Sequence, residues 1–269
     1  DQTIHAIKAE SDTALFRVFP VAGFDQGNLM AYHHIQSIEG YSPAKLKIYQ
    51  DIRDSCFTRN NMNVVNMLNV KYLIGQQRGQ DGSAQSALQL NPGMLPRAWF
   101  VDTAVISATK QETFAYLNSP AWNPKITAVL EQALPVKISK PDSSSVSFTT
   151  YHSREIALKT YSSATSLLVL SEVYYPAGWK AFIDGSESEI YKTNYVLRSV
   201  VVPAGTHVVE FKFDPPMYQL GYTLSQAGWG VAALVILIGL FRHPQIRQRI
   251  GIGRKGSVPA ADPPAATHP

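Results

Sequence analysis

The stretch EVYYPAGWKAFIDG, from Glu172 to Gly185, contains the features from which the fold of this chain is predicted. A Pro-Ala-Gly turn signal divides it, and an Asp-Gly pair that favours a tight hairpin ends it. Between these two breaks, Trp179 alternates with Ala181 and Ile183 at the period of a β-strand. The stretch therefore predicts two strands joined by a turn, with Trp179 on the face that meets a core.

Short strands at regular spacing continue the pattern on both sides of this stretch. In the last of them, Val209, Phe211 and Phe213 occupy one face and charged residues occupy the other. This alternation indicates one buried and one wet face, and an all-β sandwich is predicted over residues 126–215. The expected strands lie near residues 126–131, 136–139, 145–151, 154–160, 166–174, 179–184, 194–202 and 206–213.

Residues 1–125 have the pattern of a mixed α and β region. A helix is predicted to start at Pro43, with Ser42 as its cap, and a second follows the capping box formed by Thr109 and Glu112. Residues 76–87 are rich in Gly, Ser and Gln, which predicts a solvated loop. Strands are expected within residues 14–20, 70–74 and 95–106.

The segment LGYTLSQAGWGVAALVILIGLF, residues 220–241, is a predicted transmembrane helix. Its 22 residues would extend roughly 33 Å as a helix, and the hydrocarbon core of a bilayer is about 30 Å thick. We expect the span to cover residues 218–241. The whole chain is then an α+β region with a C-terminal all-β sandwich, followed by one transmembrane helix and a disordered tail.

Charge predicts the orientation of this span. Residues 242–269 contain five Lys or Arg and one acid, so residues 1–241 hold 19 bases and 19 acids and are neutral. A neutral body does not favour nucleic acid as a partner. A short basic tail beside a span is instead typical of the cytoplasmic side. We therefore expect a cell-membrane protein with residues 1–215 outside the cytoplasm and the Pro- and Ala-rich tail, 242–269, inside.

The expected partners are membrane lipid and other transmembrane helices of a longer protein. An outer domain followed by one span requires an earlier segment that carries it across the membrane. Within the span, Gly221, Ser225, Gly228 and Ala232 lie on one side, and small residues let helices pack closely in lipid.

Four blocks in a fixed order resemble the C-terminal end of YfhO-type bacterial membrane proteins. These are NVVNMLNVKYLI, LPRAWFV, LLVLSEVYYPAGWKAFIDG and VLRSVVVPAGTHVVEFKFDPPMYQLGYTLS, followed by the span. The resemblance extends over nearly all of residues 1–245. It implies a multi-pass protein similar to the GT-C glycosyltransferases, which use polyprenyl-phosphate-linked sugars at the outer face of the cell membrane.

The resemblance implies a sugar-transfer function in the cell envelope, with a lipid-linked sugar or an envelope glycan as partner. In GT-C enzymes the catalytic acid lies in an early outer loop, so no catalytic residue is assigned in this chain. We expect the chain by itself to be inactive. The alternative is a non-catalytic, membrane-tethered carbohydrate-binding or scaffold module.

The aromatic stretch itself supplies the first candidate site. Tyr174, Tyr175 and Trp179 can form a platform on which a sugar ring stacks, with Asp184 accepting hydrogen bonds from its hydroxyl groups. The alternative is that these residues form the turn and the edge of the sheet core. The strand period favours this second interpretation, because Trp179 shares its face with two apolar residues.

Two isolated arginines in apolar strands are the second candidate. Arg97 and Arg198 can each hold a phosphate of a lipid carrier, or pair with a nearby acid. The histidines and the single cysteine, Cys56, do not have the spacing of a metal site. The GIGRKG motif, Gly251–Gly256, is not placed between a strand and a helix, so it does not predict a dinucleotide site. We therefore expect neither a metal nor a cofactor.

Overall fold

The computed structural model describes residues 2–21, 28–78 and 84–242. The chain divides into two compact units, Asp1–Asp214 and Pro215–Pro269. The expected cytoplasmic tail, apart from Arg242, lies outside the described residues, and so does the GIGRKG motif.

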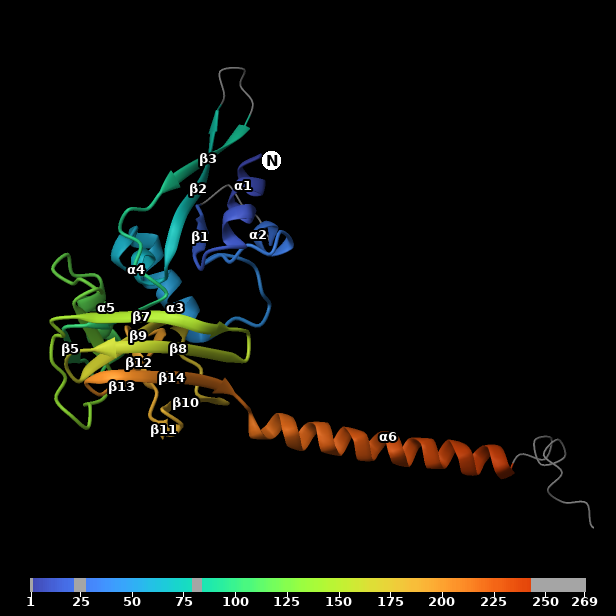
Figure 1. Ribbon diagram of the computed structural model, residues 1–269. Helices are drawn as coiled ribbons and strands as arrows, with labels where there is room; N and C mark the ends of the chain where they lie inside the picture. The colour runs from blue at the N-terminus through green and yellow to red at the C-terminus, as the bar shows by residue number, and fades with distance from the viewer. Residues whose placement is uncertain (1, 22–27, 79–83, 243–269) are drawn as a thin grey trace, which may run out of the picture. The chain divides into compact units, whose positions relative to one another are not determined.

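The N-terminal part of the first unit is a three-stranded sheet with two helices beside it (Figure 1). The strands lie in the order β1-β2-β3, and β1 runs parallel to β2. Ile7 of α1 and Met30 of α2 pack with Val18 and Ile74 of the sheet in one buried cluster. The elements are α1 (Gln2–Ser11), β1 (Arg17–Pro20), α2 (Leu29–Tyr32), β2 (Val70–Arg78) and β3 (Ala84–Leu90).

Both ends of the loop expected at residues 76–87 belong to paired strands. β2 continues to Arg78, and β3 pairs with it from Ala84 onward. The polar composition of this segment indicated a loop, but the ladder is made by backbone groups. Polar side chains are compatible with such a ladder, and the expected loop was wrong for residues 76–78 and 84–87. Residues 79–83 of the expected loop lie outside the described residues.

Three α-helices lie in the described part of residues 33–126, and the sequence predicted the start of one of them, α5, correctly. Thr109 caps α5, where its side-chain oxygen accepts a hydrogen bond from the Glu112 N–H at 3.2 Å, as the capping box predicts. Ser42 caps no helix, because α3 starts only at Lys47. The side chain of Asn28 bonds both the N–H and the C=O of Tyr41, which holds the preceding segment in a non-helical conformation. The elements are α3 (Lys47–Cys56), a 3₁₀ turn (Phe57–Arg59), α4 (Met62–Met67) and α5 (Lys110–Leu117).

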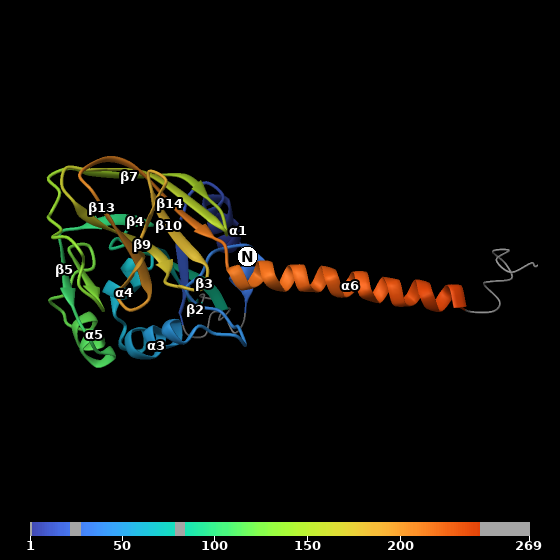
Figure 2. The same ribbon diagram turned by 90° about the horizontal axis from the view of Figure 1, so that it is seen from below.

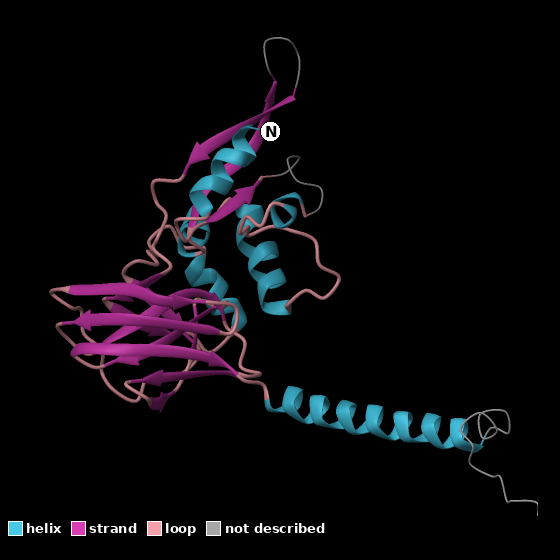
Figure 3. Cartoon of the chain, turned by 45° about the vertical axis from the view of Figure 1, so that its right-hand side comes forward, coloured by secondary structure: helices cyan, strands magenta, loops and turns pink. Residues whose placement is uncertain are grey.

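Two stacked sheets form the rest of the first unit (Figure 3). The six-stranded sheet has the order β4-β9-β13-β12-β6-β5, and the five-stranded sheet has the order β11-β10-β14-β8-β7. The first contains β4 (Ala98–Val101), β5 (Thr103–Ile106), β6 (Thr127–Leu130), β9 (Ser166–Val173), β12 (Tyr191–Thr193) and β13 (Leu197–Val202). The second contains β7 (Ser144–Tyr151), β8 (Glu155–Ser162), β10 (Trp179–Ile183), β11 (Ser186–Ser188) and β14 (Gly205–Phe213).

Strand β9 lies in the middle of these layers and is apolar on both faces, as its sequence predicts. Leu168 and Leu170 pack against Val209 and Phe211 of the five-stranded sheet. The alternate residues of β9, such as Leu167, pack in a second cluster with α3, α4 and α5. Figure 2 shows these helices on the side of β4 and β9 away from β7. The six-stranded sheet is therefore covered on both faces.

The expected boundary between residues 125 and 126 does not separate the sheets. β4 and β5, which precede it, lie in the same sheet as β9 and β6, which follow it. Residues 136–139 form no strand, while β11 and β12 arise from a segment expected to be a turn. β4 pairs with β9, and β12 pairs with β6 as well as with its neighbour β13, while β11 pairs with the adjacent strand β10. Strand pairing of this kind depends on context that the local pattern does not report.

The second unit contains one long helix, α6 (Pro216–Arg242). Within the described residues it is the one helix that is long and apolar enough to cross a membrane, with a mean hydropathy of 1.9 in its best window. None of that window is buried. The helix includes the whole span predicted at residues 218–241.

Candidate functional site

The Pro-Ala-Gly segment carries the chain from one sheet of the sandwich to the other. β9 belongs to the six-stranded sheet, and β10 belongs to the five-stranded sheet. Gly178 has a φ of +122°, which a side chain would disfavour, and its N–H bonds the C=O of Pro176 at 2.9 Å. The crossover lies at an edge of the sandwich, where side chains from both sheets meet.

A pocket of about 310 Å³ lies beside this crossover. Tyr174 and Tyr175 of the crossover and Trp179 of β10 supply aromatic walls. Arg198, from β13 of the other sheet, also lines the pocket, and the acids Glu187 and Glu189 line it as well. Four of the six residues singled out in the sequence therefore lie in one pocket.

Trp179 belongs both to the edge of the core and to the pocket. Its ring lies 5.3 Å from that of Phe213, and the side chain packs against the buried cluster between the sheets. The predicted core contact of Trp179 is confirmed. Tyr175 is the more accessible wall, with 41% of its surface exposed.

Arg198 is almost completely buried beneath this aromatic group. Only 3% of its side chain is exposed, and its guanidinium carbon lies 4.1 Å from the centre of the Trp179 ring. Among the described residues, its Nε and Nη1 atoms have no hydrogen-bond partner. The remaining nitrogen, Nη2, lies 3.9 Å from Oε2 of Glu172.

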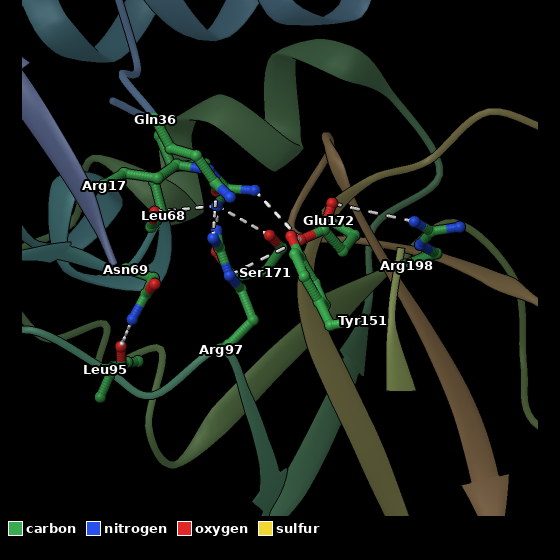
Figure 4. Close-up of polar contacts among 10 residues, drawn as sticks. All are labelled: Arg17, Gln36, Leu68, Asn69, Leu95, Arg97, Tyr151, Ser171, Glu172 and Arg198. Carbon is green, nitrogen blue, oxygen red and sulfur yellow. Dashed lines mark hydrogen bonds and ion pairs between the residues drawn. The ribbon is translucent and has the colours of Figure 1, made fainter. Parts of the chain in front are cut away.

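Glu172 connects Arg198 to two further arginines, and we call Arg17, Arg97, Arg198, Glu172 and Tyr151 the arginine cluster (Figure 4). Nη2 of Arg17 lies 3.1 Å from Oε1 of Glu172, and Nε of Arg97 lies 3.7 Å from the same oxygen. The Tyr151 hydroxyl donates to that oxygen at 2.7 Å. Within the described residues, Glu172 is the only carboxylate within ion-pair distance of the three guanidinium groups.

The cluster holds more positive than negative charge. Burial lowers the pKa of Arg97 to about 10, and it lowers the pKa of Arg198 to about 10. Burial also raises the pKa of the Tyr151 hydroxyl to about 12. At neutral pH Arg97 and Arg198 therefore remain charged and Tyr151 remains neutral. By formal charge the cluster contains three guanidinium groups and one carboxylate.

Arg97 belongs to the same cluster as Arg198 but lies against a different aromatic ring. Its guanidinium group lies against the Tyr151 ring, with 5.4 Å between the guanidinium carbon and the ring centre, and it donates a hydrogen bond to Oε1 of Gln36. Arg97 pairs with the acid Glu172, which is one of the two alternatives that the sequence left open. It does not line the aromatic pocket.

Asp184 also lies away from the pocket. It starts the β10–β11 turn with a φ of +50°, followed by Gly185 at +82°, as the Asp-Gly pair predicts. Its carboxylate accepts the Val208 N–H at 2.8 Å and lies 2.6 Å from Nδ1 of His207. The geometry therefore does not place Asp184 with the three aromatic residues of the expected sugar platform.

Sequence reasoning missed Glu172, Arg17 and Tyr151. Glu172 did carry a signal, because an acid at the end of an apolar central strand needs a compensating charge. Arg17 lies 155 residues away in the chain, and its role depends on the fold. Among the described residues, no group of three or more His, Cys, Asp or Glu side chains is placed to hold a metal ion.

These features define a class: a membrane protein with a sheet-rich domain, a charged cluster between its layers and one apolar C-terminal helix. Residues 117–225 match the family model described as bacterial membrane protein YfhO, and this match supports a bacterial membrane protein of the YfhO type. The matched segment includes β6 to β14 and the pocket residues. No curated protein and no solved structure matches the chain.

Proposed function

We propose that this chain is the outer, acceptor-side part of an envelope glycosyltransferase that uses polyprenyl-phosphate-linked sugars. In this proposal residues 1–215 lie outside the cytoplasm, α6 is the last span, and the aromatic pocket binds carbohydrate. The observation that carries the proposal is the convergence of Tyr174, Tyr175 and Trp179 on one pocket. The match of residues 117–225 to the YfhO family model supports the membrane setting.

The pocket has the composition of a sugar site. Aromatic rings stack on the apolar faces of sugars, while a few polar groups at fixed positions set the orientation of the ligand. Here Glu187 and Glu189 offer acceptors for sugar hydroxyl groups, and Arg198 offers donors. The volume of about 310 Å³ lies at the lower end of the range for ligand pockets.

The test is to replace Tyr175 with Ala and to measure glycan binding by the full chain in detergent micelles. The probes are oligosaccharides of glucose, galactose and N-acetylglucosamine. Their binding is measured by calorimetry. Loss of one stacking surface should weaken binding by about two- to tenfold, since such contacts are worth roughly 0.5–1.5 kcal/mol.

The matched control is Tyr161→Ala on β8, because Tyr161 is also 41% exposed and does not line the pocket. It should bind glycans like the unmodified chain. Equal weakening by both substitutions, or no binding of any probe by the unmodified chain, would contradict carbohydrate binding at this pocket.

Sugar transfer itself is not assigned to any residue of the arginine cluster or the pocket. We expect the chain alone to bind glycan without transferring sugar. A membrane-tethered carbohydrate-binding or scaffold module has the same pocket, and transfer assays on the longer protein separate the two proposals. Sugar transfer from a polyprenyl-phosphate donor by this chain alone would contradict the assigned acceptor-side role.

A further inference from the structure

The aromatic pocket is lined on its buried side by an arginine whose hydrogen-bonding capacity is not fully used. Arg198 is 3% exposed, lines the pocket and has two nitrogen atoms without a partner among the described residues. A buried donor without an acceptor is costly, and such groups are normally satisfied. An acceptor from a ligand would satisfy them.

The way Arg198 is held leaves these donors usable. The Trp179 ring covers the face of the guanidinium group, while N–H groups donate in the guanidinium plane. Stacking therefore fixes the position of the group without using its hydrogen bonds. Nε and Nη1 are buried and have no acceptor among the described residues, while Nη2 faces Glu172.

The charge around Arg198 favours an anion over a neutral group. The arginine cluster contains three guanidinium groups and one carboxylate, so it has an excess of positive formal charge. At the rim, Glu187 is paired with Lys180 at 3.5 Å. Glu189 accepts hydrogen bonds from Gln132 and Tyr191. Each acid already has a partner, and the charge that lacks a counter-ion lies at the buried end.

We propose that the pocket selects an anionic sugar, one that carries a carboxylate or a phosphate group. The anionic group accepts hydrogen bonds from Arg198, and the sugar ring lies against Tyr175 with its hydroxyl groups toward the rim acids. Arg198 is then the residue that determines specificity. This inference rests on the proposed carbohydrate binding and adds the charge class of the ligand.

The experiment compares matched ligands on the full chain in detergent micelles, with calorimetry at fixed salt. Glucose is the neutral ligand, and glucuronate and glucose 6-phosphate are the anionic ones. Geranyl phosphate carries a phosphate without a sugar. The unmodified chain should bind one or both anionic sugars at least about tenfold more tightly than glucose, because hydrogen bonds to charged groups are the stronger ones.

Substitution of Arg198 should remove this preference for anionic sugars. Arg198→Gln should bring the affinities for glucose and the anionic sugars to within about threefold, and Arg198→Lys should restore part of the difference. Lys159→Gln, on the exposed surface of β8, is the charge-matched control and should change neither affinity. Thermal unfolding of each variant reports whether it is folded. If Arg198→Gln does not fold, Arg198→Lys still tests the proposal.

The outcomes separate this inference from the function on which it rests. Equal binding of glucose and both anionic sugars would overturn anion selection and leave carbohydrate binding standing. Geranyl phosphate binding as tightly as glucose 6-phosphate would overturn the sugar assignment in favour of a lipid carrier phosphate. Absence of binding by every ligand would overturn both proposals.

Discussion

Glu172 has one carboxylate and faces three arginines that come from β1, β13 and the segment before β4. With 16% of its side chain exposed, it is shielded from bulk water, and Arg97 and Arg198 are even more buried. In such surroundings a carboxylate is held by its partners, and its loss leaves positive charges uncompensated. We therefore expect the stability of the contact between the N-terminal sheet and the sandwich to depend on Glu172.

Replacing Glu172 with Gln is therefore expected to destabilise the fold by about 3 kcal/mol. The measurement is urea unfolding of the full chain in detergent micelles, with tryptophan fluorescence as the readout. The control is Glu187→Gln, which removes an exposed ion pair with Lys180 and should cost less than about 1 kcal/mol. Equal stability of the two variants would show that the cluster does not depend on its carboxylate.

Asp184 and His207 form a pair whose contribution depends on pH. The hydrogen bond to Asp184 raises the pKa of His207 above 6.5. The hydrogen bond to His207, and then that from the Val208 N–H, lowers the pKa of Asp184 below 3.8. The histidine contribution is complete below pH 6.5 and is lost as the pH rises through its raised pKa. The aspartate contribution is complete above pH 3.8 and is lost as the pH falls through its lowered pKa.

His207→Gln should therefore lower the melting temperature most between pH 3.8 and 6.5, and less as the pH rises above that window. Thermal unfolding at about pH 5.5 and about pH 9 checks this. In an Asp184→Asn background, His207→Gln should lose this pH dependence. A destabilisation that is the same at both pH values in the original background would rule out the pair as its source.

At the scale of elements, a capping residue in the sequence predicted the start of a helix correctly in one case and not in another. Thr109 caps α5 through the Glu112 N–H. Ser42 has the same type of side chain and precedes a proline, yet Asn28 holds the neighbouring residue Tyr41 in another conformation. A cap signal is local, and a long-range hydrogen bond can override it.

The two residues provide a matched pair of substitutions. Thr109→Ala should destabilise the fold by about 1 kcal/mol, because the Glu112 N–H loses its acceptor. Ser42→Ala should change stability by less than about 0.5 kcal/mol, since it caps no helix and is exposed. Urea unfolding of both variants checks this, and an equal cost for both would mean that the α5 cap does not contribute.

Strand assignments divide in the same way. β9, β10 and β14 follow their sequence patterns, because alternation and apolar runs report burial directly. β3 and β11 have polar sequences and become strands because a neighbouring strand offers its backbone groups. Residues 136–139 have apolar character and no strand partner that makes them a strand.

At the scale of the whole molecule, the helix Pro216–Arg242 and the basic tail predict the membrane orientation. We expect residues before α6 outside the cytoplasm and residues after it inside, because a short basic segment beside a span stays on the cytoplasmic side. A membrane-impermeant maleimide applied to intact cells should label Ser145→Cys on β7, and label Ser257→Cys only after lysis.

Cys56 provides a low background in this measurement, because it is buried and burial raises the pKa of its thiol to about 11. The unmodified chain is the control and should stay unlabelled before lysis. Labelling of the tail variant, and not of the β7 variant, in intact cells would reverse the proposed orientation.

The sequence by itself determined the apolar helix, the alternation of β14, the double-sided burial of β9, the Asp-Gly turn and the resemblance to the YfhO family. These features depend on spacing and polarity along a continuous segment, which a sequence states directly. It also singled out Trp179 and Arg198, although without a reason to place them together.

Only the tertiary structure decided which of these residues share a site. Arg17, Arg97 and Arg198 converge on Glu172 because three elements distant in the chain meet at one edge of the sandwich. The crossover from β9 to β10 brings Trp179 onto Arg198 and turns Asp184 away. Charge compensation in a buried layer is a property of the packed molecule, because it depends on distances that no local pattern of residues contains.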